Sequence, residues 1–347
     1  MVSDWEIIEL QLVALGALLF LSLAITWFIL YYVRLLDHPT ERSSHVRATP
    51  KCGGVGIVVS FVAGVYLSQA WGYAYLVGSG VFYSLVIPVL IVASVSLADD
   101  IRELSPRLRL GVHVLAAALF LYMVEFPSRG ACGALKSSIV EVVLWGGGVV
   151  WIVGMANACN FMDGIDGLAA GQGLIAAFFF AVIQIGQGQF FLSFTSLVLV
   201  VGCLGFLAFN FPPAKVFMGD VGSVSIGFIL AALSLLALKN DPTMKTLLLV
   251  PVLMANFLFD TVYTLIFRVL NKEPIFKPHK KHLYQKFALC GFSQRTVTMT
   301  NYGLAIFQGM VMVLVGGRSP VAALLLCGAP ITIYCYFVMK KSKSKIS

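Results

Sequence analysis

The sequence predicts an all-α, polytopic integral membrane protein, and three observations support this fold class. Hydrophobic residues make up 59 % of the 347 residues and charged residues only 12 %. Apolar runs long enough to cross the roughly 30 Å hydrocarbon core recur along nearly the whole chain. Basic residues gather between alternate runs, as in proteins that cross a membrane repeatedly. We therefore expect a single membrane-embedded domain over residues 1–347.

We expect eleven transmembrane helices, with ten as the alternative count. Their order follows the apolar runs, at about 8–33, 54–70, 78–97, 109–124, 138–155, 168–185, 192–209, 222–238, 246–267, 300–316 and 321–339. The first run follows an acidic leader and has no basic region before it and no cleavage site of small residues, so it is expected to be retained. Pro106, behind Ser105, indicates the start of the fourth helix.

Basic residues predict the orientation of the chain. With the N-terminus outside, five of the 24 Lys and Arg residues lie on the outer side: Arg129, Lys136, Lys239, Lys245 and Arg318. The other 19 of the 24 lie in predicted cytoplasmic segments or in a cytoplasmic C-terminal tail, as the positive-inside rule requires. The net charge of +8 thus reflects topology and attraction to anionic headgroups and substrates, and nucleic-acid binding is not expected.

Five aspartates are concentrated in three short segments of this apolar chain. The segments are LADDI at 97–101, NFMDGIDGL at 160–168 and FMGDVGS at 217–223. Carboxylates near the hydrocarbon core are costly and therefore indicate function. The predicted topology places all three segments at cytoplasmic ends of helices, where packing can bring the five carboxylates together. These belong to Asp99, Asp100, Asp163, Asp166 and Asp220.

Two further cytoplasmic segments share this face. DHPTERSSHVRATPKCGG covers 37–54 and PHKKHLYQ covers 278–285. Four of the five histidines lie in them: His38, His45, His279 and His282. The predicted catalytic segments are therefore at about 34–53, 98–108, 156–167, 210–221 and 268–299.

The loop at 157–167 carries two aspartates and no Lys or Arg, so nearby side chains do not neutralise it. A divalent cation would do so. Carboxylate and amide oxygens suit Mg²⁺, with Mn²⁺ as an alternative, whereas the Cys and His sets that bind zinc are not found in this loop. Basic residues around this acidic centre would bind phosphate oxygens: Arg47, Lys51, Lys215, Lys280 and Lys281. A metal ion flanked by cations predicts a phosphoryl-transfer site.

Structural roles compete with these assignments. An Asp beside Gly is often part of a turn or a helix cap, and His279 and His282 are compatible with interfacial positions in a basic loop. His113, inside the fourth span, is expected to be a satisfied packing residue. For Asp260, two helical turns before Arg268, a structural polar contact competes with a catalytic role. The coincidence of three acidic segments on one face is what favours function.

The motifs, in this order, resemble those of the polyprenyl-phosphate N-acetylhexosamine-1-phosphate transferases. Five are in register between about residues 37 and 300: DHPTERSSHVRATPKCGG, LADD, NACNFMDGIDGLAAG, FNFPPAKVFMGDVGS and PHKKHLYQ. The superfamily includes the enzyme that makes the first lipid intermediate of peptidoglycan and those that start O-antigen and related polysaccharides. The resemblance implies transfer of a sugar 1-phosphate from a UDP-sugar to a polyprenyl phosphate such as undecaprenyl phosphate, with Mg²⁺ required and UMP released. It also implies the bacterial inner membrane, with the active site facing the cytoplasm.

The resemblance gives the acidic residues individual roles. Asp220 matches the metal-binding aspartate of the family. Asp99 and Asp100 match an aspartate pair, one member of which is proposed to deprotonate the lipid phosphate. Asn160 and Asp163 match a polar pair near the metal, so Asp163 is expected in catalysis and as a second metal ligand.

Other positions match parts of the family that bind substrate. Asp166 and Phe217 fall where the family holds the uracil. His279 and His282 match the ends of a histidine motif that contacts the donor diphosphate, with Lys281 at an interior position that is usually histidine. Arg47 and Lys51 are expected to bind substrate phosphates.

The donor sugar follows from smaller differences. After the aspartate pair the chain reads Ile101, Arg102, Glu103, without the lysine found there in the peptidoglycan branch. The HLYQ segment is more similar to the polysaccharide-initiating branch, which favours UDP-GlcNAc or a 6-deoxy donor such as UDP-FucNAc or UDP-QuiNAc. The phospho-MurNAc-pentapeptide transferases stay as the alternative. Direct attack and an aspartyl-phosphate intermediate both stay open, as do a monomer and a homodimer.

Two other protein classes compete with this interpretation. A secondary cation transporter would hold its acids near the bilayer midplane on broken helices, often in repeated halves, whereas these acids lie at span ends without a repeat. A CDP-alcohol phosphotransferase also has a signature that begins with Asp-Gly. It needs an arginine four residues after that Asp, and DGIDGLAAG contains none.

Overall fold

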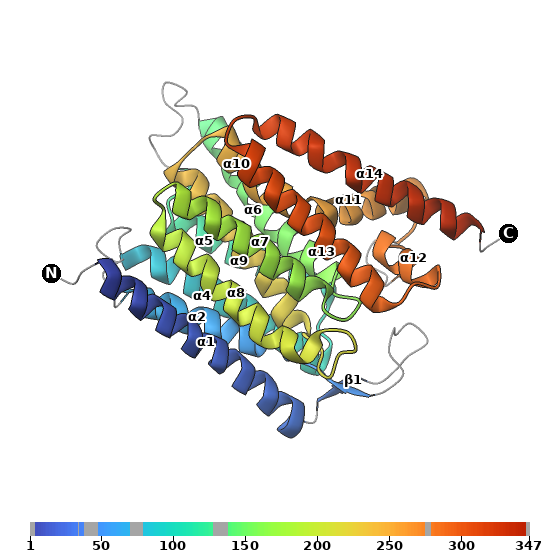
Figure 1. Cartoon of the computed structure of the whole chain (residues 1–347), viewed down its shortest axis with the longest axis horizontal. Coiled ribbons are helices and arrows are strands. Elements are labelled where there is room, and N and C mark those ends of the chain that lie inside the picture. Colours follow the sequence, from blue (N-terminus) through green and yellow to red (C-terminus); the bar gives the residue numbers. More distant parts are fainter. Residues whose placement is uncertain are drawn as a thin grey trace.

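The computed structural model describes residues 4–33, 35–37, 48–69, 79–127, 138–274 and 279–344, and helices dominate them. A short antiparallel ribbon pairs β1 (Leu36–Asp37) with β2 (Thr49–Pro50). The helices are α1 (Asp4–Tyr32), α2 (Val55–Ser68), α4 (Ser79–Arg102), α5 (Pro106–Met123), α6 (Ser138–Phe161), α7 (Leu168–Gly186), α8 (Phe190–Asn210), α9 (Asp220–Asn240), α10 (Met244–Leu253), α11 (Ala255–Leu270), α12 (Leu283–Leu289), α13 (Gln294–Val311), continued by a π-helical turn over Met312–Gly316, and α14 (Pro320–Ser344). The predicted all-α fold is confirmed (Figure 1).

The described helices also confirm a polytopic membrane protein, and their number agrees with the alternative count of ten spans better than with eleven. Nine of them are long and apolar enough to cross a membrane, and α10 with α11 makes a tenth if the bent pair counts as one span. The span expected at 54–70 contains α2, which has 14 residues. At 1.5 Å per residue, the part of this helix within the described residues is about 21 Å long, which is shorter than the hydrocarbon core.

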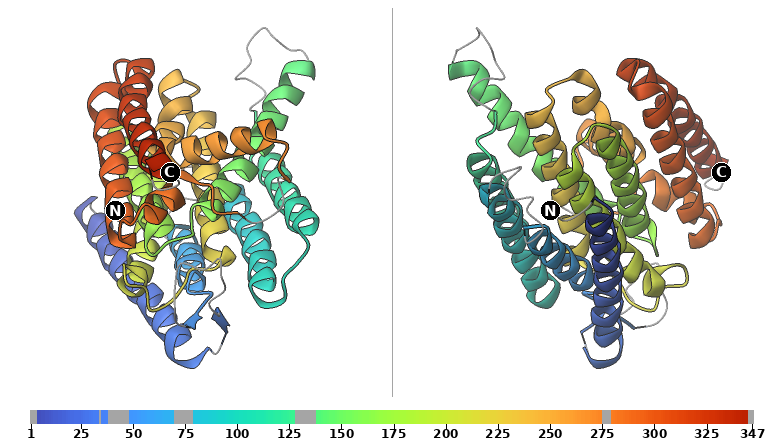
Figure 2. Two further views of the ribbon diagram at one scale, coloured as in Figure 1. Left: turned by 90° about the vertical axis from the view of Figure 1, so that its right-hand side faces the viewer. Right: turned by 60° about the vertical axis from the view of Figure 1, so that its left-hand side comes forward.

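The run at 246–267, expected as one span, consists of two helices that are bent by 74° at Met254. Pro251 lies one turn before the bend. Proline lacks an N–H to donate, and its ring clashes with the carbonyl four residues earlier, so it kinks a helix. After the bend, α11 lies across the direction of its neighbours (Figure 2).

α11 is polar on its buried side and apolar on its exposed side, the reverse of a helix on the surface of a water-soluble protein. Its buried residues are mostly polar and recur at every fourth position: Asn256, Asp260, Thr264 and Arg268. Its exposed large residues are apolar: Val262, Leu265, Ile266, Val269 and Leu270. α11 therefore presents apolar side chains outward, as suits contact with lipid, and polar side chains toward the protein.

α9 forms the centre of the bundle, and 94 % of its most apolar 18-residue stretch is buried. It packs against α4, α6 and α10 among others. Close contact with α6 depends on Gly227, where a Cβ would lie 2.3 Å from the carbonyl oxygen of Met155. This contact brings the end of α6 beside the start of α9, and the candidate site is built there.

The ends of α4, α6 and α8 and the starts of α7 and α9 lie at the end of the bundle that carries the β1–β2 ribbon (Figure 1). The predicted gathering of the acidic segments at one end is thus present in the structure. That this end faces the cytoplasm stays a prediction, as does the single domain over 1–347. The predicted site residues His38, His45 and Arg47 and the predicted outer residues Arg129 and Lys136 lie outside the described part of the chain.

Candidate active site

Two segments far apart in the sequence are joined by backbone hydrogen bonds at this end. The N–H of Gly53 donates to the carbonyl of Phe217 (2.9 Å), that of Gly54 to Met218 (2.9 Å) and that of Phe217 to Pro50 (2.8 Å). Gly54 permits this approach, because a Cβ on it would lie 2.4 Å from a backbone atom of α9. The start of α2 is thereby fixed against the loop that leads into α9.

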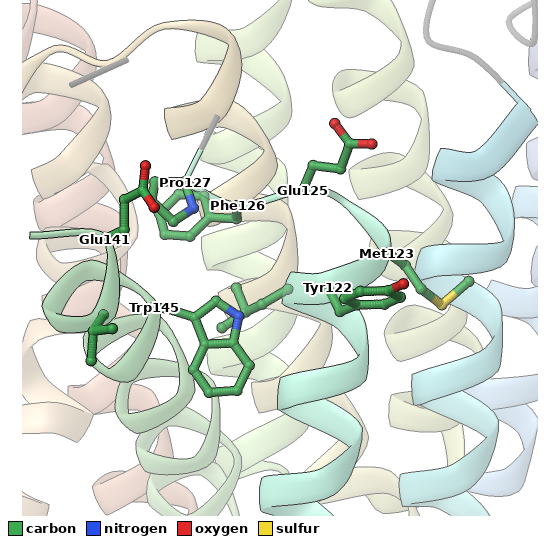
Figure 3. Close-up of a pocket in the computed structure, with 9 residues that line it drawn as sticks. Tyr122, Met123, Glu125, Phe126, Pro127, Glu141 and Trp145 are labelled. Atoms are coloured by element: carbon green, nitrogen blue, oxygen red, sulfur yellow. The ribbon is translucent and has the colours of Figure 1, made fainter. Parts of the chain in front are cut away.

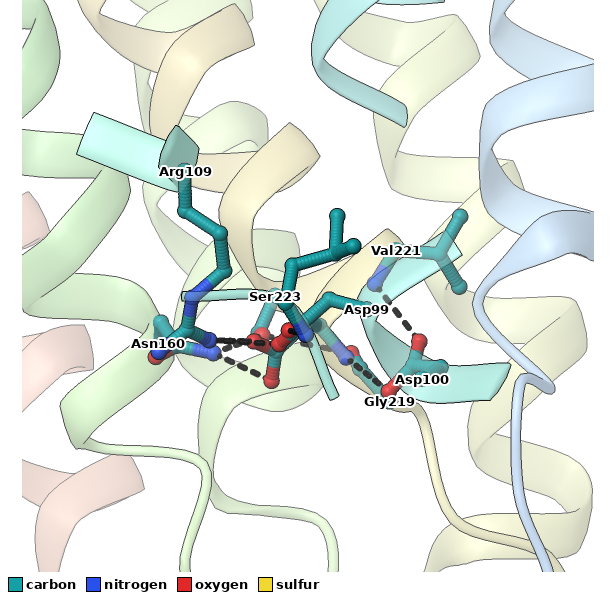
Figure 4. A network of polar contacts seen from close by, with 9 residues as sticks. Asp99, Asp100, Arg109, Asn160, Gly219, Val221 and Ser223 are labelled. Atoms are coloured by element: carbon teal, nitrogen blue, oxygen red, sulfur yellow. Dashed lines mark hydrogen bonds and ion pairs between the residues drawn. The ribbon is translucent and has the colours of Figure 1, made fainter. Parts of the chain in front are cut away.

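Asp100 fixes the start of α9 from the other side (Figure 4). Its Oδ1 accepts from the N–H of Asp220 (3.0 Å) and its Oδ2 from the N–H of Val221 (3.1 Å). A carboxylate here satisfies free N–H groups of the helix end and is favoured by the helix dipole. The preceding Gly219 has a φ of +74°, and a Cβ on it would lie 2.5 Å from Asp100. Asp100 therefore positions Asp220, and the catalytic role predicted for Asp100 stays a prediction.

Arg109, in the first turns of α5, joins two of the acidic segments. Its Nη1 donates to Oδ2 of Asp99 (2.6 Å) and to Oδ2 of Asp220 (2.8 Å). Asp99 also accepts from the N–H of Leu104 (2.6 Å) through Oδ1. All three charged side chains are partly buried, and charge-assisted hydrogen bonds of this kind are stronger than neutral ones. The guanidinium thus holds the two carboxylates together at the start of α5.

Asn160, in the last turn of α6, completes this network (Figure 4). Its Nδ2 donates to Oδ1 of Asp220 (2.8 Å) and to the Ser223 hydroxyl (3.1 Å). Asp220 therefore accepts hydrogen bonds through both of its oxygens, one from Arg109 and one from Asn160. The predicted proximity of Asn160 and Asp220 is present, whereas the sequence reasoning gave no role to Arg109 or Ser223.

The loop between α6 and α7 is held by an asparagine that the sequence reasoning also missed. Asn210, at the end of α8, is 3 % exposed. Its Oδ1 accepts from the N–H of Gly167 (2.9 Å), and its Nδ2 donates to the carbonyl of Val216 (2.8 Å). Nearby, Oδ2 of Asp166 accepts from the N–H of Ala214 (2.9 Å). These contacts bind the DGIDG loop to the segment that leads into α9.

A cavity of about 350 Å³ opens between these loops, and we call it the acidic cavity. Its lining includes Asp100, Asp163, Asp166, Asp220, Lys51 and Phe217. With Asn160, which also lines it, seven of the predicted site residues thus face one space. Burial, followed by the negative charges of Asp220, Asp100 and Asp166, raises the pKa of Asp163 well above its ordinary value.

The oxygen donors of the acidic cavity fit Mg²⁺. Among the described residues, no three His, Cys, Asp or Glu side chains lie close enough to hold a metal ion by themselves. Mg²⁺ does not need such a cluster, because it is usually held by one or two carboxylates together with substrate phosphates and water. Five carboxylates line the cavity, with Asp37 as the fifth, and Lys51 is the only cationic side chain among its lining residues. Asp163 and Asp220 are the residues that would hold the ion.

The histidine segment is anchored by Asp260 of α11, which is 2 % exposed. Its Oδ1 lies 3.0 Å from Nδ1 of His282 and accepts from the N–H of Leu283 (2.9 Å), while Oδ2 accepts from the N–H of Tyr284 (3.1 Å). Of the two interpretations left open by the sequence, the structure favours the structural one for Asp260. The residue orients His282 and caps the start of α12.

His279 and Lys281 lie beside this anchor. Burial, followed by the positive charge of Arg268, lowers the pKa of His279 to about 4. Its Nδ1 accepts from the N–H of Lys281 (3.3 Å), so the neutral ring carries its proton on Nε2, which can donate to a phosphate oxygen. The Lys281 ammonium is paired with Glu273. Its predicted contact with donor phosphate would require this exposed ion pair to open.

A second cavity, of about 400 Å³, lies between α5, α6 and α11, and we call it the basic cavity. Its ionisable lining residues are Arg109, Arg268, His113, His279, His282 and Asp220. Apolar side chains complete the wall, including Leu110, Val224 and Leu265. The two cavities share Asn160, Asp220 and Gln285. Lys215 and Lys280, also predicted to bind phosphate, line neither of them.

A wider hollow, of about 680 Å³, lies elsewhere, between the end of α5 and the start of α6. Figure 3 shows its aromatic side chains Tyr122, Phe126 and Trp145 with the carboxylates of Glu125 and Glu141. No predicted site residue lines it. Size alone therefore does not identify the site, whereas the convergence of charged and amide groups does.

The fold and the site define a membrane-embedded enzyme, and comparison with known proteins identifies its class as a transferase. The family model described as glycosyl transferase family 4 matches residues 82–238, which contain all the predicted aspartates. A probable undecaprenyl-phosphate N-acetylglucosaminyl 1-phosphate transferase of Bacillus subtilis (strain 168) is 32 % identical over 271 residues, covering 77 % of this chain and 73 % of the relative.

Other relatives extend the match. A decaprenyl-phosphate N-acetylglucosaminephosphotransferase of Mycobacterium tuberculosis (strain ATCC 25618 / H37Rv) is 30 % identical over 356 residues, covering 91 % of this chain and 86 % of the relative. A phospho-N-acetylmuramoyl-pentapeptide-transferase of Enterococcus hirae is 28 % identical over 279 residues, covering 76 % and 83 %. The chain belongs to glycosyl transferase family 4, within the polyprenyl-phosphate N-acetylhexosamine-1-phosphate transferase superfamily.

Proposed function

We propose that the protein transfers an N-acetylhexosamine 1-phosphate from a UDP-sugar to a polyprenyl phosphate such as undecaprenyl phosphate and releases UMP. The observation that carries this proposal is the position of Asp220 and Asn160 where two cavities of opposite charge meet. Such a junction lets a nucleotide bound with a cation on one side meet an anionic acceptor from the other. The names of the relatives, which include polyprenyl phosphates, support the same pair of substrates.

The donor occupies the acidic cavity in this proposal. Asp166 and Phe217 line it together and would hold the uracil, by a hydrogen bond and by stacking respectively. The donor diphosphate would lie toward Asp220 and reach the imidazoles of His279 and His282 across the shared wall. Mg²⁺, when bound by Asp220 and Asp163, would neutralise charge on the diphosphate.

The acceptor enters the basic cavity from the bilayer. An acceptor of this class combines a phosphate with a long apolar chain, and the basic cavity combines cationic groups with apolar walls. α11 forms one wall and exposes its apolar side chains outward, so a lipid can pass along it without crossing polar surface. Arg109 then lies both beside Asp220 and in the wall of the acceptor's cavity.

The reaction joins the two substrates at this junction. A phosphate oxygen of the acceptor attacks the β-phosphorus of the donor, and the bond from that phosphorus to the bridging oxygen breaks, so that UMP leaves. Arg109 and Asn160 would stabilise the charge that moves toward the leaving group. A phosphate monoester has a second pKa near 6 and is mostly ionised at neutral pH. Asp99, the proposed base, therefore takes up a proton from a minority of acceptors and at the same time orients Arg109.

The donor sugar we propose is N-acetylglucosamine or a 6-deoxy relative, for the initiation of O-antigen or another envelope polysaccharide on the cytoplasmic face of the inner membrane. The B. subtilis and M. tuberculosis relatives, which are the more similar of those described, carry N-acetylglucosamine in their names. The E. hirae relative supports the second candidate, the muramoyl-pentapeptide donor.

The test uses the full chain purified in detergent with undecaprenyl phosphate and Mg²⁺. UMP release is measured for UDP-GlcNAc, UDP-FucNAc, UDP-QuiNAc and UDP-MurNAc-pentapeptide, and reactions without acceptor serve as controls. We expect acceptor-dependent UMP with an N-acetylglucosamine-type donor and its loss on chelation of Mg²⁺. Absence of acceptor-dependent UMP with every donor would contradict the proposed function, and UMP from the muramoyl donor alone would select the second candidate.

A further inference from the structure

His113 of α5 is a buried imidazole whose hydrogen bonds are not satisfied within the described part of the chain. Its side chain is 4 % exposed, and neither Nδ1 nor Nε2 has a hydrogen-bond partner among the described residues. The sequence led us to expect a satisfied packing residue, and the structure contradicts that expectation. Buried polar side chains in proteins are almost always hydrogen-bonded, so an exception requires a specific cause.

The cause we identify is the place of His113 in the wall of the basic cavity. It follows Arg109 by four residues, so the two side chains lie on the same side of α5. With a rise of 1.5 Å per residue, His113 is about 6 Å further into the bundle than Arg109. Near it in the same wall are the apolar side chains of Leu110 and Val224. The imidazole thus lines a cavity whose wall carries both charged and apolar side chains.

Two other buried side chains show that a missing partner is not by itself a site. Gln184 and Gln308 are at most 1 % exposed, and their amide atoms lack partners among the described residues. They line neither the acidic cavity nor the basic cavity. His113 differs from both because its side chain lines the basic cavity.

We propose that His113 binds the phosphate of the acceptor lipid, its imidazole N–H donating to a phosphate oxygen on the side of the α5 wall. The proposal rests on the proposed function, because it takes the basic cavity to be the acceptor's. The phosphate of such a lipid would accept the missing hydrogen bond of the imidazole. Its apolar chain would at the same time lie along the apolar wall of the cavity. The nucleotide donor, held from the acidic cavity, does not touch His113.

The kinetic test separates acceptor from donor. In the full chain, His113→Leu removes both ring nitrogens and keeps an apolar filling, whereas His113→Gln keeps an N–H donor. Gln308→Leu is the matched control, since it removes an equally buried, unpartnered polar side chain outside both cavities. We expect His113→Leu to raise the KM for undecaprenyl phosphate by about tenfold with the donor KM within about twofold, and His113→Gln to stay within about threefold of wild type.

A binding test keeps this proposal distinct from the proposed reaction. Native mass spectrometry of the purified protein would compare undecaprenyl phosphate with undecaprenol, which lacks the phosphate, and with inorganic phosphate as a competitor. We expect wild type to prefer the phosphorylated lipid and His113→Leu to lose that preference while it still retains the lipid chain. If the wild-type protein shows this preference but turns over no UDP-sugar, the proposed reaction is contradicted and the proposed role of His113 in lipid binding still stands. An unchanged acceptor KM and an unchanged preference in His113→Leu would overturn the proposal for His113.

Discussion

The acidic and the basic cavity share one wall, yet they are built for different substrates. The acidic cavity is lined by loops that join helix ends, and its side chains are mainly carboxylates and amides. The basic cavity lies between helices, and its wall combines arginine and histidine side chains with apolar ones. The first offers oxygen ligands to a cation and a nucleotide, whereas the second offers hydrogen-bond donors to an anion that carries a lipid chain.

This difference shows how a membrane enzyme can bring together two substrates that arrive from different phases. Asp220 belongs to both cavities and is held in place by Arg109, Asn160 and the N-terminal position it takes in α9. The donor therefore reaches the Asp220 carboxylate from the acidic cavity, and the acceptor reaches it from the basic cavity. The variants below test how far the two cavities are separate in function.

The largest effect is expected at the shared carboxylate. Asp220→Asn keeps the size of the side chain but removes its charge, so the metal site and the partner of Arg109 are both lost. We expect turnover to fall by about 100-fold or more at saturating Mg²⁺, with insertion into the membrane unchanged. Glu141→Gln, in the hollow lined by Tyr122 and Trp145, is the control and should keep wild-type turnover. Activity of Asp220→Asn above about a tenth of wild type would contradict the metal-ligand assignment.

The next effect is expected at Arg109, which links the two cavities through Asp99 and Asp220. Arg109→Met leaves these two carboxylates without their common cation, and we expect kcat to fall by about 10- to 100-fold. Arg109→Lys should recover only part of the loss, because an ammonium lacks the planar fork of the guanidinium. Steady-state kinetics of both variants checks this, and equal activity of Arg109→Met and wild type would remove Arg109 from the site.

A smaller effect, confined to one substrate, is expected at His282. If His282 contacts the donor diphosphate, His282→Ala should weaken UDP-sugar binding by about 10- to 100-fold, the equivalent of about 1.5 to 3 kcal/mol for a hydrogen bond to a charged group. Asp99→Asn should instead lower kcat and leave donor binding nearly unchanged. Calorimetric titration of UDP-sugar into both variants measures the difference. Normal donor binding in His282→Ala together with weak binding in Asp99→Asn would reverse the two roles.

The smallest effect is expected at Glu273, the ion-pair partner of Lys281. Glu273 pairs with Lys281, its Oε2 lies 3.6 Å from Nε of Arg268, and solvent weakens an ion pair in so exposed a position. Glu273→Gln should therefore change the thermal stability of the protein only slightly, as a melting curve would measure. If Lys281 moves to the donor phosphate during binding, the same variant should bind UDP-sugar slightly more tightly, because Lys281 no longer has to leave its partner. Weaker donor binding in Glu273→Gln would show that Lys281 acts from its place beside Glu273.

Much of the site could be predicted because its signals are local in the sequence. Asp99, Asp100, Asp163 and Asp220 stand out as carboxylates at the ends of apolar runs. The alternation of basic and apolar segments is enough to place all of them at one end of the bundle. The expected start of the eighth span at 222 differs from the observed start of α9 by two residues, which is within the usual uncertainty of helix ends.

Other features depend on contacts that no local pattern reports. Arg109 appears in the sequence as one more cytoplasmic basic residue, and its bridge between α4 and α9 exists only once these helices pack. The bend after Pro251 is hidden because an apolar run looks the same whether it is straight or broken. Asn210 acts on backbone atoms of two distant loops. The missing hydrogen-bond partner of His113 can be seen only in the structure, because the sequence does not show which side chains surround a buried residue.

The central claim is that phosphoryl transfer occurs at Asp220, where the two cavities meet. Crystals grown with UDP and Mn²⁺ in place of Mg²⁺ test it most directly, because anomalous scattering locates the manganese without reference to any assumed ligand. The account predicts one strong manganese position in contact with the Asp220 carboxylate and the diphosphate, and none in crystals of Asp220→Asn. Manganese bound with UDP away from Asp220, or retained in Asp220→Asn, would contradict the account.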